Sequence, residues 1–130
     1  MPPAVPRIVV AESDLPVRHL MTTVLTRAGV CVIPVPHLDA AVAACDNDPT
    51  VWAAIVDASM APRPAEAFAH LRTARPHFAV LLVGSGETPA AVDGVARLSK
   101  PFTSTDLLRA VDALVGMANP GGGRTNDAAG

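Results

Sequence analysis

One aspartate, Asp57, stands at the end of a long apolar run. The segment at 51–60 reads VWAAIVDASM, and the six residues before the aspartate are all apolar. A continuous run of this length, followed by prolines, predicts a strand buried on both faces of a parallel sheet. An acid at the carboxyl end of such a strand is expected to be exposed in the crevice where open α/β sheets bind ligands. Asp57 is therefore the leading candidate for chemistry.

Other charged residues follow two more predicted strands. Glu12 and Asp14 come directly after the first strand, and Lys100 comes after the fifth. Because the carboxyl ends of parallel strands meet at one edge of a sheet, we expect these side chains to converge with Asp57. Carboxylates that converge repel one another and require a cation nearby. Lys100 could supply one positive charge, and a divalent ion with oxygen ligands could supply two.

The elements that must position these residues are short and alternate along the chain. Strands are expected at 7–11, 30–35, 51–56, 79–83 and 95–99. Helices are expected at 15–28, 39–45, about 64–75, 88–94 and about 104–115. This alternation predicts one α/β domain at 6–117, with a parallel sheet, right-handed crossovers and helices on both faces. The tail at 118–130 has no apolar pattern and is predicted to be disordered.

Local signals sharpen this outline. Pro34 cannot donate to a central ladder, so the second strand is expected at a sheet edge. Gly29 suits a left-handed helix end, and Thr103 with Asp106 has the spacing of a capping box. The helix faces expected to be buried carry Val17, Leu20, Met21, Val24, Leu25 and Ala28, then Ala67, Phe68, Leu71 and Ala74, then Leu107, Leu108, Val111, Leu114 and Val115.

The overall composition excludes several classes of function. The chain has 130 residues, a formal charge of −2 and a pI near 6.0, with no basic stripe, which argues against direct binding to nucleic acid or anionic membrane. Cys31 and Cys45 are expected to be free thiols, and the four histidines lack metal-binding spacing. No apolar run is long enough to span a membrane and no signal peptide opens the chain, which predicts a cytoplasmic protein.

Taken together, the order of these motifs resembles the receiver domain of two-component response regulators, a flavodoxin-like family. The resemblance rests on the acidic turn at 12–14, on Asp57-Ala58-Ser59-Met60 and on Lys100-Pro101-Phe102, and it covers about residues 7–116. It implies a five-stranded sheet of order 2-1-3-4-5. The fourth helix, at 88–94, is abbreviated, which is similar to the receivers at the C-terminus of hybrid histidine kinases.

The resemblance also implies a function. Asp57 would accept a phosphoryl group from a histidine kinase or phosphotransfer protein, and Lys100, before a frequently cis proline, would pair with the phosphate. Mg²⁺ would be held by Glu12, by Asp57 and by the backbone carbonyl of Ser59, with Asp14 as a further ligand unless it caps the helix. The protein would signal to a downstream protein partner as a monomer or weak dimer. It would not be an enzyme beyond its own phosphorylation and hydrolysis.

Three positions depart from the family pattern and leave a second function open. Ser13 replaces an acid that usually binds the metal, so Mg²⁺ is expected to bind weakly. Gly84 falls where the family has a switch hydroxyl, which Ser85 could replace, and Arg97 falls where it has a buried aromatic. The alternative is a pseudo-receiver, an interaction module that binds its partner without phosphate. A phosphoaspartyl hydrolase would need a second acid where Ser59 stands.

Overall fold

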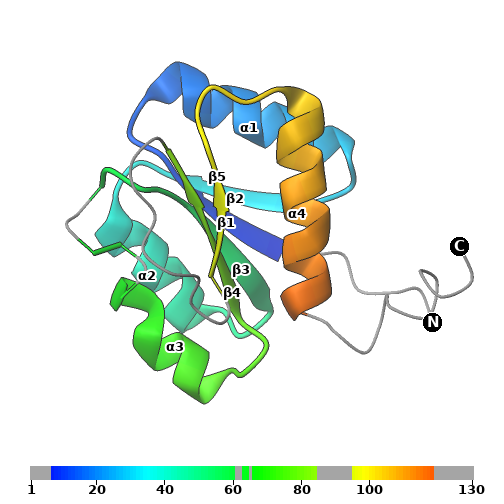
Figure 1. Ribbon diagram of the computed structural model, residues 1–130. Helices are drawn as coiled ribbons and strands as arrows, with labels where there is room; N and C mark the ends of the chain where they lie inside the picture. Colours follow the sequence, from blue (N-terminus) through cyan, green and yellow to red (C-terminus); the bar gives the residue numbers. More distant parts are fainter. Residues whose placement is uncertain (1–6, 61–62, 65, 85–94, 119–130) are drawn as a thin grey trace, which may run out of the picture.

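A computed structural model describes residues 7–60, 63–64, 66–84 and 95–118 (Figure 1). These residues form a five-stranded sheet of β1 (Arg7–Ala11), β2 (Cys31–Val35), β3 (Val51–Asp57), β4 (Ala79–Val83) and β5 (Val95–Leu98). All neighbouring strands are parallel, and their order is β2-β1-β3-β4-β5. The predicted sheet is confirmed, and β2, with its proline, is an edge strand.

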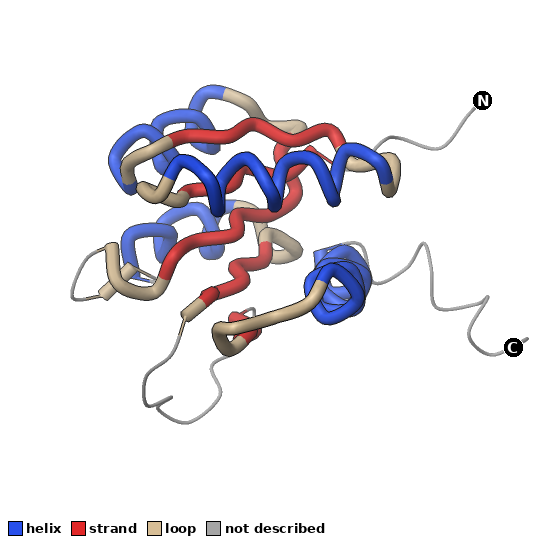
Figure 2. Tube along the Cα trace, turned by 90° about the horizontal axis from the view of Figure 1, so that it is seen from above, coloured by secondary structure: helices blue, strands red, loops and turns tan. Residues whose placement is uncertain are grey.

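The helices cover both faces of this sheet, as Figure 2 shows from above. They are α1 (Leu15–Arg27), α2 (Leu38–Asn47), α3 (Ala69–Ala74), which follows the short 3₁₀ helix η1 (Glu66–Phe68), and α4 (Ser104–Ala118). The connections place α1 and α4 on one face and α2 and α3 on the other (Figure 1). The abbreviated helix expected at 88–94 and the tail at 119–130 lie outside the described residues.

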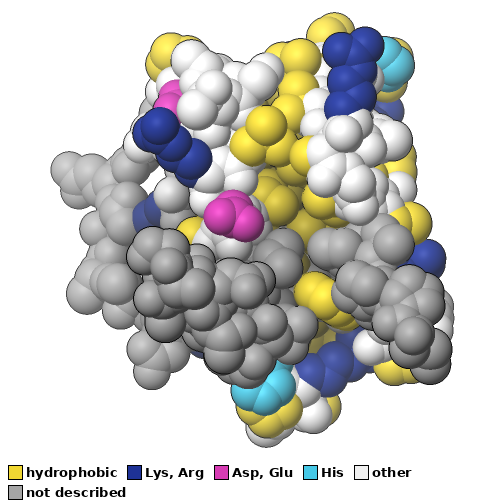
Figure 3. Space-filling model, turned by 90° about the vertical axis from the view of Figure 1, so that its right-hand side faces the viewer, with side chains coloured by type: hydrophobic (Ala, Val, Ile, Leu, Met, Phe, Trp, Pro, Cys, Tyr) yellow, Lys and Arg dark blue, Asp and Glu magenta, His cyan; other side chains and the backbone are white. Residues whose placement is uncertain are grey.

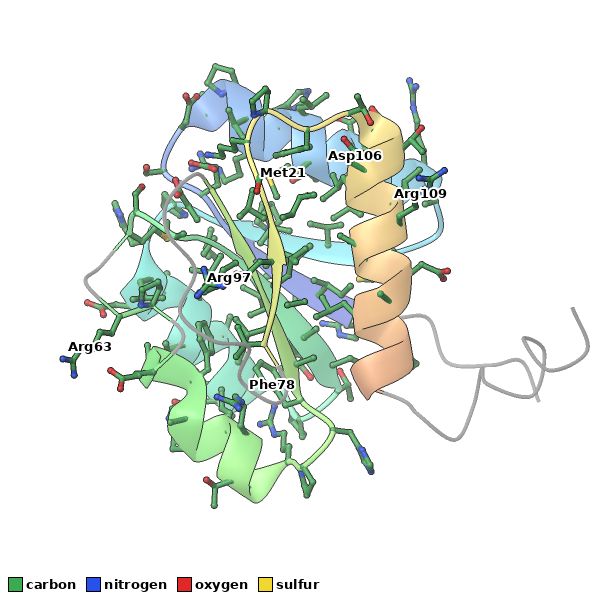
Figure 4. The ribbon with its side chains drawn as sticks, viewed as in Figure 1. Met21, Arg63, Phe78, Arg97, Asp106 and Arg109 are labelled. Carbon is green, nitrogen blue, oxygen red and sulfur yellow. The ribbon has the colours of Figure 1, made fainter. Side chains whose placement is uncertain are left out.

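Each face of the sheet builds its own apolar core, because successive strand residues point to opposite sides. Ile8, Ile55 and Leu81 face α1 and α4, where they pack with residues such as Met21. The other face contains the residues Val9, Val56, Phe68, Leu71, Phe78 and Leu82 against α2 and α3. Figure 4 shows Met21 and Phe78 on these opposite sides. Helices therefore pack on both faces of the sheet, and this packing fixes the position of the carboxyl ends of the strands.

The predicted helix ends are confirmed where they can be followed. The Asp14 side chain accepts a hydrogen bond from the Val17 amide at 3.5 Å, which caps α1. Gly29 follows α1 with φ +92°, a conformation that favours glycine. Thr103 and Asp106 form the reciprocal pair of a capping box, each side chain accepting from the other's amide at 3.0 Å.

Some predictions about helix faces were wrong. The helix expected over 64–75 is divided into η1 and the six-residue α3, and Ala74 is exposed. Leu20 and Leu108, both expected in the core, are 51% and 36% exposed. Figure 3, in which the right-hand side of Figure 1 faces the viewer, shows apolar side chains in a band down the middle of that face. On α1 and α4 the row of apolar side chains is therefore wider than the part of the helix surface that is buried.

Two further features bear on the bulk predictions. Both cysteines are free, as expected, and burial raises the pKa of the Cys45 thiol to about 12. Among the described residues, no helix has the length and apolar character needed to cross a membrane.

Candidate functional site

Three side chains from distant parts of the chain meet at the carboxyl edge of the sheet. The Lys100 ammonium Nζ lies 3.2 Å from Glu12 Oε1 and 3.7 Å from Asp57 Oδ2. Glu12 follows β1, Asp57 ends β3 and Lys100 follows β5, so residues up to 88 positions apart in sequence are in contact. The predicted convergence is confirmed for these three residues. We call Glu12, Asp57 and Lys100 the carboxyl-edge cluster.

Asp57 is held in a defined orientation by the residue two positions later. Its Oδ1 accepts hydrogen bonds of 2.9 Å from both the amide and the hydroxyl of Ser59. Only 8% of Asp57 is exposed, which is less than the position at a strand end suggested. The carboxylate is therefore mostly enclosed, and its second oxygen faces Lys100.

Opposing effects set the charge of Asp57. Burial alone would raise the pKa of its carboxyl. The hydrogen bonds from the Ser59 amide and hydroxyl, together with the positive charge of Lys100, outweigh burial and hold this pKa below its usual range. At neutral pH Asp57 is therefore an ionised carboxylate, the form that can act as a nucleophile.

Glu12 is the most buried acid of the cluster, with only 2% of its surface exposed. One carboxylate oxygen accepts from Lys100 and the other accepts from the Asp14 amide at 3.1 Å. Its backbone is fixed as well, because its amide donates to the Val35 carbonyl and its carbonyl accepts from Arg18 at 2.7 Å. A buried charge is tolerable only with such complete pairing.

Sequence reasoning did not identify Arg18 or the hydroxyl of Ser59 as parts of the site. A signal for Arg18 exists: it precedes the buried Met21 by three residues and Leu25 by seven, so helical spacing places it on the inward face of α1. An arginine on a buried face requires an acceptor, and the Glu12 carbonyl supplies it. Ser59 gives no comparable signal, because its contacts depend on the turn after β3.

The other predicted site residues are placed less decisively. Asp14 is exposed and its side chain caps α1, so it does not join the carboxyl-edge cluster. The contacts of Ser59 run through its amide and hydroxyl, and nothing tests a role for its carbonyl. Ser85 lies outside the described residues. The Lys100-Pro101 peptide bond is cis.

Gly84 lies where the family's switch hydroxyl was expected, and its surroundings explain the glycine. Its φ is +153°, and a Cβ built there would lie 3.2 Å from the Ala58 Cβ and 3.8 Å from Asp57 Oδ1. The turn after β3 is tied to the end of β4 by a 2.8 Å hydrogen bond from the Ala58 amide to the Val83 carbonyl. The backbone of Gly84 therefore approaches Asp57 in a way that a side chain would obstruct.

Arg97 is exposed, so it does not replace a buried aromatic. On β5 it shares its side of the sheet with Val95, which packs toward α2 and α3 (Figure 4). The two positions that couple the family's usual switch thus carry neither a hydroxyl, at Gly84, nor an aromatic ring.

The oxygen atoms of the cluster do not fit a tightly held Mg²⁺. Mg²⁺ binds in near-octahedral geometry, mostly through carboxylate oxygens and water. In the described part of the chain, the cluster offers two carboxylates, Glu12 and Asp57. Three of their four oxygens accept hydrogen bonds, and the fourth faces Lys100. Within the described ranges, no group of three or more His, Cys, Asp or Glu side chains is arranged to hold a metal ion. Binding of Mg²⁺ itself stays a prediction.

An open groove of about 490 Å³ lies beside the cluster. It is lined by Ser13, Ser59 and Met60 and by residues 36–39 at the start of α2. Ser59 lines this groove and also donates to the Asp57 carboxylate, so the groove adjoins the acid.

Comparison with known proteins identifies the fold. No family model matches the sequence, and no curated protein matches it. A response regulator receiver protein from Sinorhizobium medicae is 21% identical, with a TM-score of 0.75 over 88% of this chain and 98% of that one. The fold is that of a receiver domain. Vibrio cholerae chemotaxis protein CheY4 (19%, TM-score 0.73, covering 85% and 99%) and the receiver domain of the hybrid histidine kinase CckA (22%, 0.70, covering 84% and 98%) are similar too.

Proposed function

We propose that this receiver fold accepts a phosphoryl group on Asp57 from a histidine kinase or phosphotransfer protein. The observation that carries the proposal is the convergence of Asp57, Glu12 and Lys100, brought from three strand ends into one contact cluster. An ionised acid held beside a lysine at the carboxyl edge of a parallel sheet is suited to phosphoryl transfer. That reaction depends on positioning and charge stabilisation more than on covalent help from the protein.

In the proposed reaction an oxygen of Asp57 attacks the phosphorus of a phosphohistidine on the partner. The phosphorus–oxygen bond forms as the phosphorus–nitrogen bond breaks, and the departing imidazole keeps the electron pair. Asp57 Oδ2 is the favoured nucleophile, because Oδ1 already accepts two hydrogen bonds from Ser59. The Lys100 ammonium, 3.7 Å from Oδ2, lies where it can pair with the transferred group.

The output of this reaction is a change of charge. A phosphoryl group carries about −1.5 to −2 charges at neutral pH, so the cluster must rearrange around it. The switch residues of the family are absent at Gly84 and Arg97. The groove that shares Ser59 with the site is a surface through which a downstream protein partner could sense the change.

The test is phosphorylation of the full chain by a small acyl phosphate, followed by measurement of intact mass. We expect a phosphoryl adduct on the wild type and none on Asp57→Asn. The matched control is Asp112→Asn, which removes an exposed acid on α4, and its adduct should equal that of the wild type. A wild type without adduct, or an adduct retained by Asp57→Asn, contradicts the proposal.

A second function is favoured by the departures from the family pattern. In the pseudo-receiver alternative the same fold binds a protein partner without phosphate, and support comes from Ser13, from the exposed Arg97 and from the close packing at Gly84. Partner affinity would then be unchanged by Asp57→Ala. A loss of affinity in Asp57→Ala, or a gain on phosphorylation of the wild type, supports the first proposal instead.

A further inference from the structure

We infer that the positive charge of this site is built into the chain as Lys100 and Arg18, so that Asp57 takes a phosphoryl group without a bound divalent metal ion. The inference rests on the proposed function and adds to it the means by which charge is neutralised. It follows from the mismatch between the oxygen atoms present and the coordination that Mg²⁺ needs.

The first argument is that the carboxylates of the cluster are already engaged. Glu12 Oε1 accepts from Lys100 and Glu12 Oε2 from the Asp14 amide, while Asp57 Oδ1 accepts from the amide and hydroxyl of Ser59. The remaining oxygen, Asp57 Oδ2, faces Lys100. A metal ion could reach Asp57 Oδ2 beside Lys100, but any further carboxylate oxygen would have to be shared with, or taken from, the chain's own donors.

The second argument is that, among the residues the structure describes, no third acid joins the two carboxylates. Ser13 offers only a neutral hydroxyl, and it is exposed at the groove rather than packed in the cluster. The Asp14 side chain caps α1, and its amide is the donor that holds Glu12. The acidic turn thus contributes one carboxylate to the site.

The third argument is the balance of fixed charge. Two carboxylates, Glu12 and Asp57, are opposed by two cations: Lys100 contacts both acids, and Arg18 Nη1 lies 2.7 Å from the Glu12 carbonyl oxygen. Both cations are anchored. Phe102, two residues beyond Lys100, packs against the apolar core, and Arg18 lies on the inward side of α1. The formal charges of these four residues sum to zero, so no divalent ion is needed to hold Glu12 and Asp57 together.

The chemistry balances without a metal ion. With an acyl phosphate as donor, Asp57 forms the new phosphorus–oxygen bond and the acyl oxygen leaves with its electron pair as a carboxylate. No proton, oxidant or reductant is required. The charge on the transferred oxygens is met by the Lys100 ammonium, which is already 3.7 Å from Asp57 Oδ2.

The experiment compares the rate of phosphorylation of the full wild-type chain by an acyl phosphate in millimolar Mg²⁺ and in excess EDTA, followed by intact mass. We expect the two rates to agree within about twofold, a difference of about 0.4 kcal/mol or less in barrier. A rate at least about tenfold higher with Mg²⁺ overturns the inference. Ser13→Asp supplies the missing acid, and its rate is expected to become dependent on Mg²⁺.

Arg18 is tested by a matched pair of variants on the same helix. Arg18→Gln removes the inward cation, and its rate in EDTA is expected to fall about tenfold, whereas Arg27→Gln, in the exposed last turn of α1, should match the wild type. Suppose that Arg18→Gln and wild type react at equal rates and have the same helix content by circular dichroism. This result would show that Arg18 does not help to neutralise charge at the site.

Calorimetric titration with Mg²⁺ separates this inference from the proposed function. Saturable binding to the unphosphorylated wild type with a dissociation constant below about 1 mM contradicts the inference whether or not Asp57 is phosphorylated. Weaker or undetectable binding, with binding gained in Ser13→Asp, supports it. Absence of an adduct in both buffers contradicts the proposed function. The titration would then still test whether the site binds Mg²⁺.

Discussion

Two charged clusters lie at opposite ends of β1 and β3, and they differ in how completely their charges are matched. At the amino ends, Arg7 of β1 contacts Asp48, just before β3, at 2.7 Å. Asp48 also accepts hydrogen bonds from the amide and hydroxyl of Thr50. These hydrogen bonds from Thr50, with the contact to Arg7, lower the pKa of Asp48 to about 2. These short contacts, in which one cation meets one acid, make Arg7, Asp48 and Thr50 a structural clasp.

At the carboxyl ends, the pairing is longer and less even. Lys100 is shared between Glu12 at 3.2 Å and Asp57 at 3.7 Å, and the acids are far more buried than at the other end of the strands. A single cation shared at these distances is fully paired with neither acid. The amino-end cluster therefore pairs its charges more closely than the carboxyl-edge cluster does, as we would expect if the latter accepts a phosphoryl group as proposed.

The largest effect is expected from breaking the carboxyl-edge cluster at its cation. Lys100→Met leaves the buried acid Glu12 and its neighbour Asp57 without their shared charge, which should lower the free energy of unfolding by about 2–4 kcal/mol. Urea denaturation measures this loss. Arg7→Met, at the more exposed clasp, should cost clearly less.

The double variant Glu12→Gln/Lys100→Met is the control for that comparison. It removes one acid with the cation and should recover part of the lost stability, because fewer unpaired charges are then buried. If Lys100→Met and Arg7→Met prove equally mild, the two ends of the sheet do not differ as described.

A smaller effect is expected from glycine substitutions at the two positive-φ positions. Gly84→Ala places a Cβ 3.2 Å from that of Ala58 and should cost about 1–3 kcal/mol. Gly29→Ala, at φ +92° with no atom within 4 Å of the added Cβ, bears backbone strain alone and should cost about 1–2 kcal/mol. Thermal unfolding of both variants gives the comparison. A milder effect at Gly84 than at Gly29 would mean that the approach to Asp57 is not tightly packed.

The smallest effect concerns acid sensitivity of the amino-end clasp. The pKa of Asp48 is lowered from 3.8 to about 2 in the folded chain, so its contribution to stability is fully present above about pH 4 and is lost as the pH falls through 2. Asp48→Asn should lower the melting temperature at pH 7 by less than about 4 °C. The difference from wild type should shrink between pH 4 and pH 2. A difference that stays constant over this range would show that the clasp does not depend on the ionised acid.

Most of the fold could be predicted from the sequence because its strands are apolar runs with clear ends. The order of the sheet and the meeting of Glu12, Asp57 and Lys100 followed from strand-end positions and from the resemblance to receivers. The exposure of Leu20 and Leu108 did not. Each lies about 100° around its helix from the nearest buried residue, at the margin of the apolar stripe, where spacing alone cannot say how far the sheet reaches.

Other details depend on geometry that a pattern does not contain. The segment at 66–74 begins as a 3₁₀ turn, and Phe68, the residue before α3, offers no side chain to cap it. The two hydrogen bonds from Ser59 to Asp57 arise from the turn after β3. The close approach of Gly84 requires knowing that β4 is tied to that turn.

The most direct test of the central claim is to locate the phosphoryl group after treatment of the wild-type chain with an acyl phosphate. Fragmentation mass spectrometry of the peptide that contains β3 should assign the group to Asp57. An adduct on another residue, or none on this peptide while the chain is folded, would contradict the claim that the carboxyl-edge cluster is a phosphoryl acceptor.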